Sequence, residues 1–412
     1  MRRFFVQHRP STPPSGSTVA VATRLSRLGL HVAFITLFAV LGGALRGFNL
    51  LLILAGLLVG VLLLQWRLSR RIAESVAVRR LEPPDAYAGR SFPLQFVVTN
   101  HSRWLPAWLV MLEDRLAPAI ADGARKPATA TAGVGLLLPG NRRECGYQCV
   151  IQHRGRYRLG PAKLQTGFPF GLSLARHRES PETVDLYIYP RPFELHHRWN
   201  QILEARSSGL AATAKRSGIS EGDFYGLREW RNGDSQRWIH WRTTARLDEL
   251  AVRQFEQQRR YELCLLLDAS CASASPSERD IEAVERAVRL TATLVLKLTR
   301  SPINRVTLVV AGRQTQTMVV TNAVLAIRAA MRALAEVEPA PPGNLVAALS
   351  AGLEVAGSGR PTVVISPHAV DERRLSNAVF DLHTEHCDLR WLDIHSPAAE
   401  NLILGDQHDA TT

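Results

Sequence analysis

Two uncharged apolar runs near the N-terminus are the clearest feature in the pattern of hydrophobic and polar positions. Leu28 to Leu45 and Phe48 to Trp66 contain no charged residue, and only Arg46 and Gly47 separate them. Each run is close to the roughly 18 to 20 residues that a helix needs to cross the core of a bilayer. The pattern predicts a transmembrane helical hairpin over 28–66. A cleaved signal peptide is the alternative for the first run, and a buried helical pair is the alternative for both.

Short alternating segments follow, over 73–190. The strand-like segments are Ser75–Leu81, Phe92–Asn100, Trp108–Glu113, Gly133–Leu138, Glu144–His153, Tyr157–Gln165 and Val184–Tyr189. Proline, glycine and asparagine separate them, as is typical of strands joined by turns. The spacing predicts an all-β, β-sandwich-like domain with a spacer or recognition role.

Strands and helices alternate over 261–405. Glu262–Asp268 is a continuous apolar run, as expected for a parallel strand that is covered on both faces. Further strands are predicted at Arg305–Val310, Gln316–Val320, Thr362–Ser366 and Leu389–Ile394, and helices at Asp280–Thr299, Val324–Val337, Leu345–Val355 and Arg373–His383. This alternation predicts a doubly wound α/β sheet.

The segment 218–260 lies between these domains and follows a linker over 191–217. The part 205–217 of this linker has little apolar bulk, which predicts a mobile loop. The segment is rich in arginine, acids and tryptophan, and the residues that we single out are Arg228, Glu229, Trp230, Gly233, Asp234, Arg237, Trp241, Arg246 and Arg253. Arginine binds a carboxylate with two parallel bonds and stacks on indole rings. We therefore expect a charge network that joins neighbouring modules. A binding surface for an anionic ligand or partner is the alternative.

This segment resembles the signature of the bacterial domain of unknown function family 58. The matching positions are Leu227, Arg228, Glu229, Trp230, Gly233, Asp234, Arg237, Ile239, Trp241, Ala245, Arg246, Leu250, Val252, Arg253, Phe255 and Glu256. The resemblance implies a membrane-attached protein with a von Willebrand type A-like domain after the signature and a MoxR-type AAA+ ATPase as partner. It implies no molecular activity. The block 168–172 also resembles a family feature, although Phe168 stands where an acid is expected.

The end of the first α/β strand resembles a second motif, the metal-ion-dependent adhesion site of von Willebrand type A domains. Asp268 and Ser270 fit its Asp-x-Ser-x-Ser pattern, whereas Ala272 replaces the second serine. Asn344 and Ser366 stand where a threonine and an acid would come. Because Mg²⁺ prefers several oxygen ligands, the resemblance implies a degenerate site, and we expect no resident cofactor.

The formal charge of +13 is concentrated near the apolar runs. Residues 1–80, which include the basic segment 1–27, hold eleven arginines and one acid, so they carry +10. Arginines flank both outer ends of the hairpin, and the positive-inside rule then places both termini and the main body in the cytosol, at the inner membrane. Five cysteines without paired spacing agree with that compartment. We expect a lipid bilayer as a partner and no nucleic acid.

The sequence holds no nucleophile elbow, no phosphate loop and no zinc-protease motif. The candidate acid–base groups for a hydrolase-like enzyme are Asp223, Glu229, Asp234 and His240. Neighbouring arginines would lower the pKa values of the carboxyl groups and make them poor proton donors. We therefore expect an interaction or scaffold protein that works with the ATPase in the assembly or maturation of other proteins. The alternatives are that enzyme and a metal-dependent adhesion-type binding module.

Overall fold

The structure is a computed structural model. It describes residues 21–120, 127–177, 183–196, 224–231, 234, 236–255, 262–271, 276–302, 304–341, 345–357, 360–368 and 389–404. The chain divides into two compact units, Met1–Tyr189 and Pro190–Thr412. The predicted loop 205–217 and the predicted helix 373–383 lie outside the described residues.

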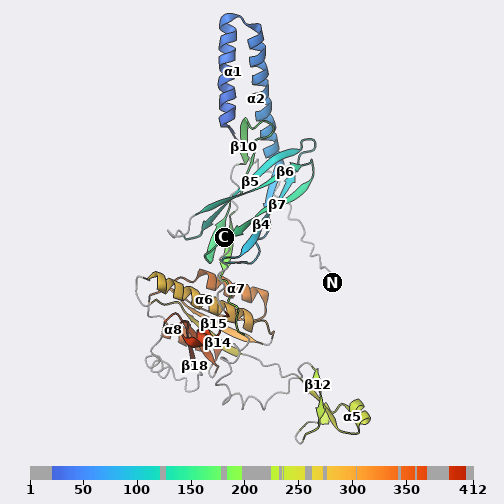
Figure 1. Cartoon of the computed structure of the whole chain (residues 1–412), viewed down its shortest axis with the longest axis vertical. Helices are drawn as coiled ribbons and strands as arrows, with labels where there is room; N and C mark the ends of the chain where they lie inside the picture. Colours follow the sequence, from blue (N-terminus) through green and yellow to red (C-terminus); the bar gives the residue numbers. More distant parts are fainter. Residues whose placement is uncertain are drawn as a thin grey trace. The chain divides into compact units, whose positions relative to one another are not determined.

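Two apolar helices, α1 (Arg27–Arg46) and α2 (Asn49–Ser75), lie side by side at one end of the first unit (Figure 1). Both are long and apolar enough to cross a membrane. The buried residues of α1 are Gly29, Thr36, Ala39 and Gly43. This spacing places small side chains on one face, where they let two helix backbones approach closely. A Cβ atom at Gly43 would lie 2.9 Å from the side chain of Leu52 on α2.

The helix α2 continues past the predicted end at Trp66 and leads directly into a strand. It ends at Ser75, and β2 (Val76–Arg80) begins at the next residue. The predicted strand start at Ser75 was therefore wrong by one residue. Because no linker separates α2 from β2, the hairpin is joined to the β-rich region through continuous regular structure.

The β-rich region contains two sheets. The three-stranded sheet has the order β2–β4–β7, with β4 (Ser91–Asn100) and β7 (Arg142–Val150). The eight-stranded sheet has the order β1–β10–β9–β5–β8–β11–β3, with β6 paired to β5. Its strands are β1 (Val21–Leu25), β3 (Ala86–Tyr87), β5 (Ala107–Pro118), β6 (Ala128–Leu137), β8 (Gly155–Leu159), β9 (Lys163–Thr166), β10 (Ser173–His177) and β11 (Val184–Tyr189). All these pairs are antiparallel except β11–β3.

One hydrophobic core connects both sheets with the end of α2. It includes Phe96 and Val98 from β4, Val110 and Leu112 from β5, and Ile72 from α2. The shared core packs the two sheets and the end of α2 against one another.

One strand was not predicted, and one predicted strand was wrong. Residues 21–25, within the basic N-terminal segment 1–27, form the strand β1, which pairs with β10. The predicted strand Tyr157–Gln165 is divided into β8 and β9. It breaks at Gly160, where φ is 95°, and at Pro161, which has no N–H for a strand ladder.

The second unit contains a five-stranded sheet with the order β16–β15–β14–β17–β18. Its strands are β14 (Glu262–Asp268), β15 (Arg305–Ala311), β16 (Thr315–Val320), β17 (Thr362–Ser366) and β18 (Leu389–Asp393). All pairs are parallel except the antiparallel edge pair β15–β16. The predicted α/β arrangement is therefore confirmed as a mostly parallel sheet with helices between its strands.

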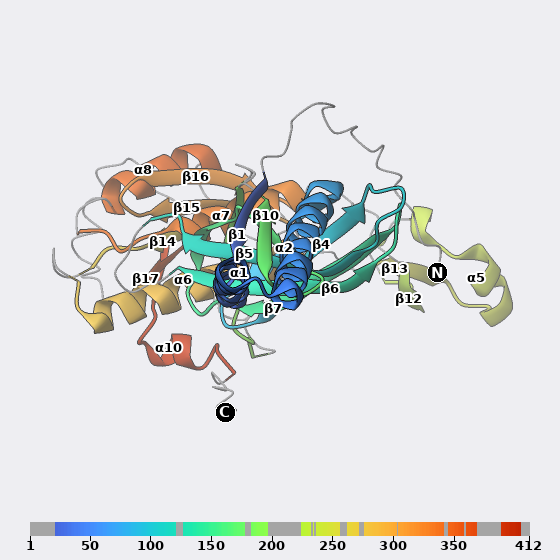
Figure 2. The ribbon, with the colours of Figure 1, turned by 90° about the horizontal axis from the view of Figure 1, so that it is seen from above.

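Helices cover both faces of this sheet. They are α6 (Glu278–Leu298), α7 (Val324–Glu336) and α8 (Leu345–Ala356), and a short α10 (Pro397–Glu400) follows β18. Figure 2 shows α6 and α8 on opposite sides of the strands, and α7 contacts α6. At Gly352 the helix α8 lies against β15, because a Cβ atom there would come within 2.7 Å of Val309 Cγ2.

The signature segment forms a small module of its own. It consists of β12 (Phe224–Glu229), a 3₁₀ turn η1 (Gln236–Trp238), α5 (Trp241–Leu247) and β13 (Ala251–Phe255). The strands β12 and β13 pair antiparallel. The helix α5 therefore begins at Trp241, the last of the closely spaced apolar residues Trp238, Ile239 and Trp241.

Candidate functional site

A two-pronged ion pair closes the turn of the signature module. Arg228 Nη1 and Nη2 lie 2.6 and 2.7 Å from the two carboxylate oxygens of Asp234. The backbone N–H of Arg231 also donates to Asp234, at 2.9 Å. The hydrogen bonds from Arg228 and Arg231 hold the pKa of Asp234 below its usual value. The pair therefore fixes the chain between β12 and η1.

Of the other predicted network residues, Glu229 contacts this pair through its backbone carbonyl, which accepts from Arg228 Nη1 at 3.0 Å. Glu229, Arg237, Arg246 and Trp241 are exposed, Trp241 to 65%. Their exposure leaves an indole and two guanidinium groups available at the surface of the module.

The last three predicted network residues are described less completely. Trp230 is partly buried, and its backbone N–H donates to the carbonyl of Leu250 at 2.9 Å. Arg253 pairs with Leu227 through the strand backbone. Gly233 and the side chain of Arg253 lie outside the described residues.

Contacts of His240, a candidate acid–base group, and of two threonines hold α5 in place. The N–H of His240 donates to the Ala251 carbonyl at 2.8 Å, and the N–H of Ala251 donates to Thr244 Oγ1 at 3.1 Å. His240 Nδ1 lies 2.7 Å from Thr243 Oγ1. The only sequence signal for these contacts is the short polar stretch around two adjacent threonines.

A second cluster lies where the α/β sheet reverses its winding. β15 and β17 flank β14 on opposite sides, and the carboxyl ends of such neighbours border the crevice in which open α/β sheets bind ligands. Asp268 ends β14 and Ser366 ends β17. Asp268 is 3% exposed, and its two carboxylate oxygens accept hydrogen bonds from the Ser270 N–H at 2.9 Å and from Ser366 Oγ at 3.1 Å. Burial raises the pKa of Asp268.

Two further groups adjoin this cluster, and sequence reasoning missed both. His368 donates its backbone N–H to Ser366 Oγ at 3.3 Å, and its Nε2 lies 3.8 Å from Asp280 Oδ1. Asp280 also closes the capping box of α6 with Ser277, whose hydrogen bonds lower the pKa of Asp280. The Ser-x-x-Asp spacing before an apolar run could have indicated the cap, but not the approach of His368.

The cluster fits Mg²⁺ incompletely. Among the described residues, no group of three or more histidines, cysteines, aspartates and glutamates is placed to hold a metal ion. Asp268 is the one acid of the predicted pair, and its oxygens already accept protein hydrogen bonds. Ala272 and Asn344 lie outside the described residues.

A third arrangement fastens the apolar hairpin to the β-rich region. Gln65 is fully buried, and its Nε2 donates to the carbonyls of Gly167, Phe168 and Ser173 at 2.9, 3.2 and 3.3 Å. Its Oε1 accepts from the N–H of Phe170 at 2.8 Å. The block 168–172, noted in the sequence for its family resemblance, therefore serves as a socket for a side chain of α2.

Neighbouring contacts extend this joint to α1 and β1. Ser69 Oγ lies 3.0 Å from Ser173 Oγ, and Trp66 Nε1 donates to Thr23 Oγ1 at 3.0 Å. Gly29 lies directly against the Leu172 carbonyl, and a Cβ atom there would overlap its oxygen. The lone glutamine inside the apolar run was the only sequence signal for this site.

These features define a protein with two lipid-compatible helices fastened to a β-rich unit, followed by an α/β unit. Within the second unit, residues 226–370 match the family model described as "Protein of unknown function DUF58". The chain therefore carries a DUF58 region, and the resemblance of the signature segment to family 58 is confirmed, whereas the von Willebrand type A-like domain stays a prediction. No curated protein matches the chain.

Three similar solved structures each match little more than a quarter of this chain. A β-glucosidase from Listeria innocua in complex with gluconolactone is 12% identical, covers 27% of this chain with 16% of its own, and has a TM-score of 0.20. The DNA glycosylase AlkC from Pseudomonas fluorescens, bound to DNA, is 11% identical over 28% of this chain and 30% of its own, with a TM-score of 0.21. A CARDB domain from Pyrococcus furiosus is 11% identical, and the match covers 28% of this chain and 94% of that domain, with a TM-score of 0.18. Likenesses at this level carry no argument about fold or function.

Proposed function

We propose that the chain is a membrane-anchored, cytosolic-facing interaction protein that works with a MoxR-type AAA+ ATPase in the assembly or maturation of other proteins. The observation that carries the proposal is the Gln65 joint. Four hydrogen bonds to one buried side chain hold the apolar helices rigidly against a folded body. Such a joint is suited to an anchor that fixes a body beside a membrane.

The exposed surface of the helices supports the anchor. Many large apolar side chains on α1 and α2 are 40–83% exposed. They include Leu30, Phe34, Leu37, Phe38, Leu41 and Leu45 on α1, and Leu50, Ile53, Leu57, Leu63 and Leu64 on α2. Exposure of apolar surface to water costs about 25 cal/mol per Å², whereas lipid tails accept the same surface without that cost. We infer that these side chains face lipid.

The arginines support the orientation. Arg24 lies on β1 just before α1, and Arg27 begins α1. Arg67, Arg70 and Arg71 lie in the last turns of α2. The positive-inside rule then places both helix ends, both termini and the body at the cytosolic face of the inner membrane. The contacts of β1 and β10 with α2 agree, because they keep both ends of the hairpin at one side of it.

The folded body supports a docking role. The β-rich unit suits a β-sandwich, and the sheet order, with one antiparallel edge strand, suits a von Willebrand type A-like domain. The signature module adds an exposed Trp241 between Arg237 and Arg246. Tryptophan and arginine are the residues that most often dominate protein interfaces. We assign the docking of the ATPase to this module.

Crosslinking of the full chain in native membranes tests the proposal. The wild type is expected to crosslink to a MoxR-type ATPase, and Trp241→Ala with Arg246→Ala is expected to abolish the product without changing the melting temperature. Arg332→Ala, on α7 of the same unit, is the control. Absence of an ATPase from the wild-type products, or equal products from all variants, would refute the partner.

A second candidate function rests on the cluster at Asp268. A buried carboxyl at a sheet switch point, with a raised pKa, suits a binding or acid–base site, and hence the adhesion-type module or the hydrolase-like enzyme. In the enzyme case, turnover would be lost in Asp268→Asn or Asp234→Asn while the fold is retained. Thermal melting and turnover measured on the same variants separate the candidates.

A further inference from the structure

Exposed aromatic and aliphatic side chains surround the base of the helix pair. They are Leu25, Trp66, Trp104, Trp108 and Phe170, and Trp104 is 90% exposed. Contacts place several of them at the same level as the Gln65 joint. Trp66 adjoins Gln65, Phe170 donates its N–H to Gln65, and Trp108 stacks on Phe168 with ring centroids 5.7 Å apart. We call these five residues the collar.

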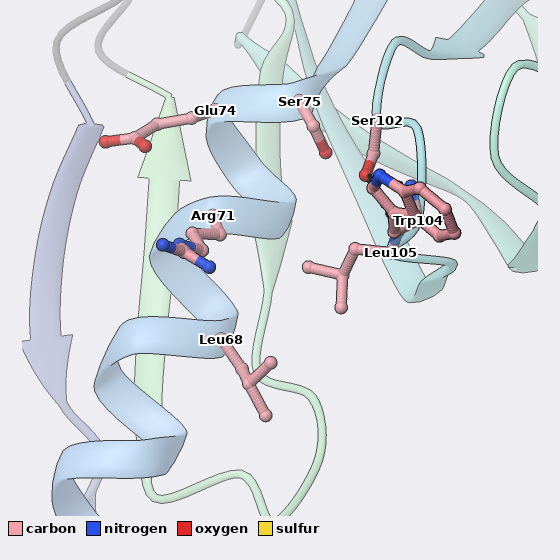
Figure 3. A pocket seen from close by; sticks show the side chains of 7 residues that line it. All are labelled: Leu68, Arg71, Glu74, Ser75, Ser102, Trp104 and Leu105. Carbon is pink, nitrogen blue, oxygen red and sulfur yellow. Dashed lines mark hydrogen bonds between the residues drawn. The ribbon is translucent and has the colours of Figure 1, made fainter.

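A shallow, open cavity of about 470 Å³ lies on the surface at the collar, between the last turns of α2 and the loop that joins β4 to β5. It is lined by Leu68, Arg71, Glu74, Ser75, Ser102, Trp104 and Leu105. Figure 3 shows Leu68 on α2 and Leu105 on the β4–β5 loop at opposite sides of it, with Ser75 at the end of α2 and Ser102 on the same loop as Leu105. Its apolar residues therefore lie toward the helix pair, and its hydroxyl groups lie toward the body.

The loop that carries Trp104 is held by hydrogen bonds. Ser102 Oγ accepts from the N–H of Leu105 at 2.8 Å, and Asn100 Nδ2 donates to the Leu105 carbonyl at 2.9 Å. Asn100 is itself fully buried. The indole of Trp104 is thus presented to the surroundings by an ordered loop. Such exposure is costly in water, whereas tryptophan is enriched at membrane interfaces.

The charge at the cavity is positive. Glu74 is paired with Arg70, whose Nε lies 2.8 Å from its carboxylate, so its charge is balanced locally. The exposed Arg71 and Arg103 leave an excess of positive charge beside the cavity. With a rise of 1.5 Å per residue, Arg71 lies roughly 9 Å along α2 from Gln65, where the apolar run ends. A bilayer places its headgroups within the first 5 to 8 Å or so outside the hydrocarbon core, and arginine side chains can extend back toward them.

We propose that this cavity binds the headgroup of an anionic phospholipid from the bilayer that α1 and α2 span. Arg71 contacts the lipid phosphate, Leu68 and Leu105 contact the glycerol and the first methylene groups, and Trp104 lies in the interface beside them. The proposal rests on the proposed membrane anchoring. It adds a lipid class, and it gives the collar the role of orienting the body at the membrane surface.

Native mass spectrometry of the full chain tests the site. Detergent-solubilised protein is given equal amounts of phosphatidylglycerol and phosphatidylcholine, and the retained lipids are counted. The wild type is expected to retain phosphatidylglycerol preferentially. Arg71→Ala is expected to reduce that preference about five-fold, the ratio that corresponds to the contribution of one basic residue near a membrane surface. Arg79→Ala, an exposed arginine on β2 away from the cavity, is the matched control.

Several outcomes would overturn the site. Equal retention of the two lipids by the wild type would do so, as would identical behaviour of Arg71→Ala and Arg79→Ala at unchanged melting temperature. Displacement of phosphatidylglycerol by excess inorganic phosphate would point to a soluble anion instead. A chain that stays in membranes without lipid preference refutes this inference alone. A chain that is extracted from membranes without detergent refutes the proposed anchoring.

Quenching by brominated lipids gives an independent readout. In nanodiscs of phosphatidylglycerol with bromine near the headgroup, the wild type is expected to show more quenching than Trp104→Phe. Equal quenching would place Trp104 away from the lipid and contradict the proposal.

Discussion

Replacement of Gln65 by leucine tests how the hairpin is fastened to the body. Leucine has a similar size but cannot reproduce the hydrogen bonds to Gly167, Phe168, Phe170 and Ser173. The two Nε2 hydrogens serve three carbonyls, so we count three full bonds. At about 1 kcal/mol for each net bond, the loss is about 3 kcal/mol. The buried N–H of Phe170, left without its acceptor, adds to this loss.

Thermal unfolding of the detergent-solubilised chain measures this effect. For a unit of this size, 1 kcal/mol corresponds to roughly 2 to 4 °C, so we expect the transition of the first unit to fall by about 6 to 12 °C. Gln95→Leu is the matched control, because Gln95 is exposed on β4. Membrane retention should be unchanged, since the apolar spans are intact. If the first unit has the same melting temperature in Gln65→Leu and in Gln95→Leu, the joint does not hold the hairpin.

Three further predictions concern the second unit. Gly352→Ala should destabilise this unit by about 1 to 3 kcal/mol, because the new methyl group meets Val309 Cγ2 at 2.7 Å. The control Gly312→Ala should be neutral, and equal denaturant midpoints of the two variants would contradict the prediction. Burial raises the pKa of Asp268, so its contribution to stability is complete below the ordinary carboxyl pKa of about 4 and is lost as the pH rises through the pKa of the folded state. Asp268→Asn should therefore raise the melting temperature at pH 7 and leave it unchanged at pH 3. A lower melting temperature of the variant at pH 7 would show that the charge is needed. Arg228 lowers the pKa of Asp234, so that contribution is present at pH 7 and lost in acid; Asp234→Asn should reduce protection of the β12–β13 amides from hydrogen exchange at pH 7 only, and unchanged protection would contradict the pairing.

Long, strongly patterned segments could be predicted from the sequence. The apolar runs at 28–66 correspond to α1 and α2, and the run Glu262–Asp268 matches β14. In these segments the periodicity follows directly from burial or lipid exposure. Boundaries were less certain where a polar sequence continues a helix, as in α2 beyond Trp66.

The sites depend on contacts between residues that are distant in the sequence. Gln65 and Phe170 are separated by 105 positions, and Asp268 and Ser366 by 98. Local pattern shows that a glutamine interrupts an apolar run, but not which carbonyls it meets. The signature motif, in contrast, indicated Arg228 and Asp234, because they are six positions apart and joined by a turn.

Protease digestion of sealed membrane vesicles tests the central claim most directly. The second unit should be digested in inverted vesicles, which expose the cytosolic face, and protected in right-side-out vesicles. It should also sediment with the membranes. Digestion from the outer face, or recovery of the chain in the soluble fraction without detergent, would contradict the account.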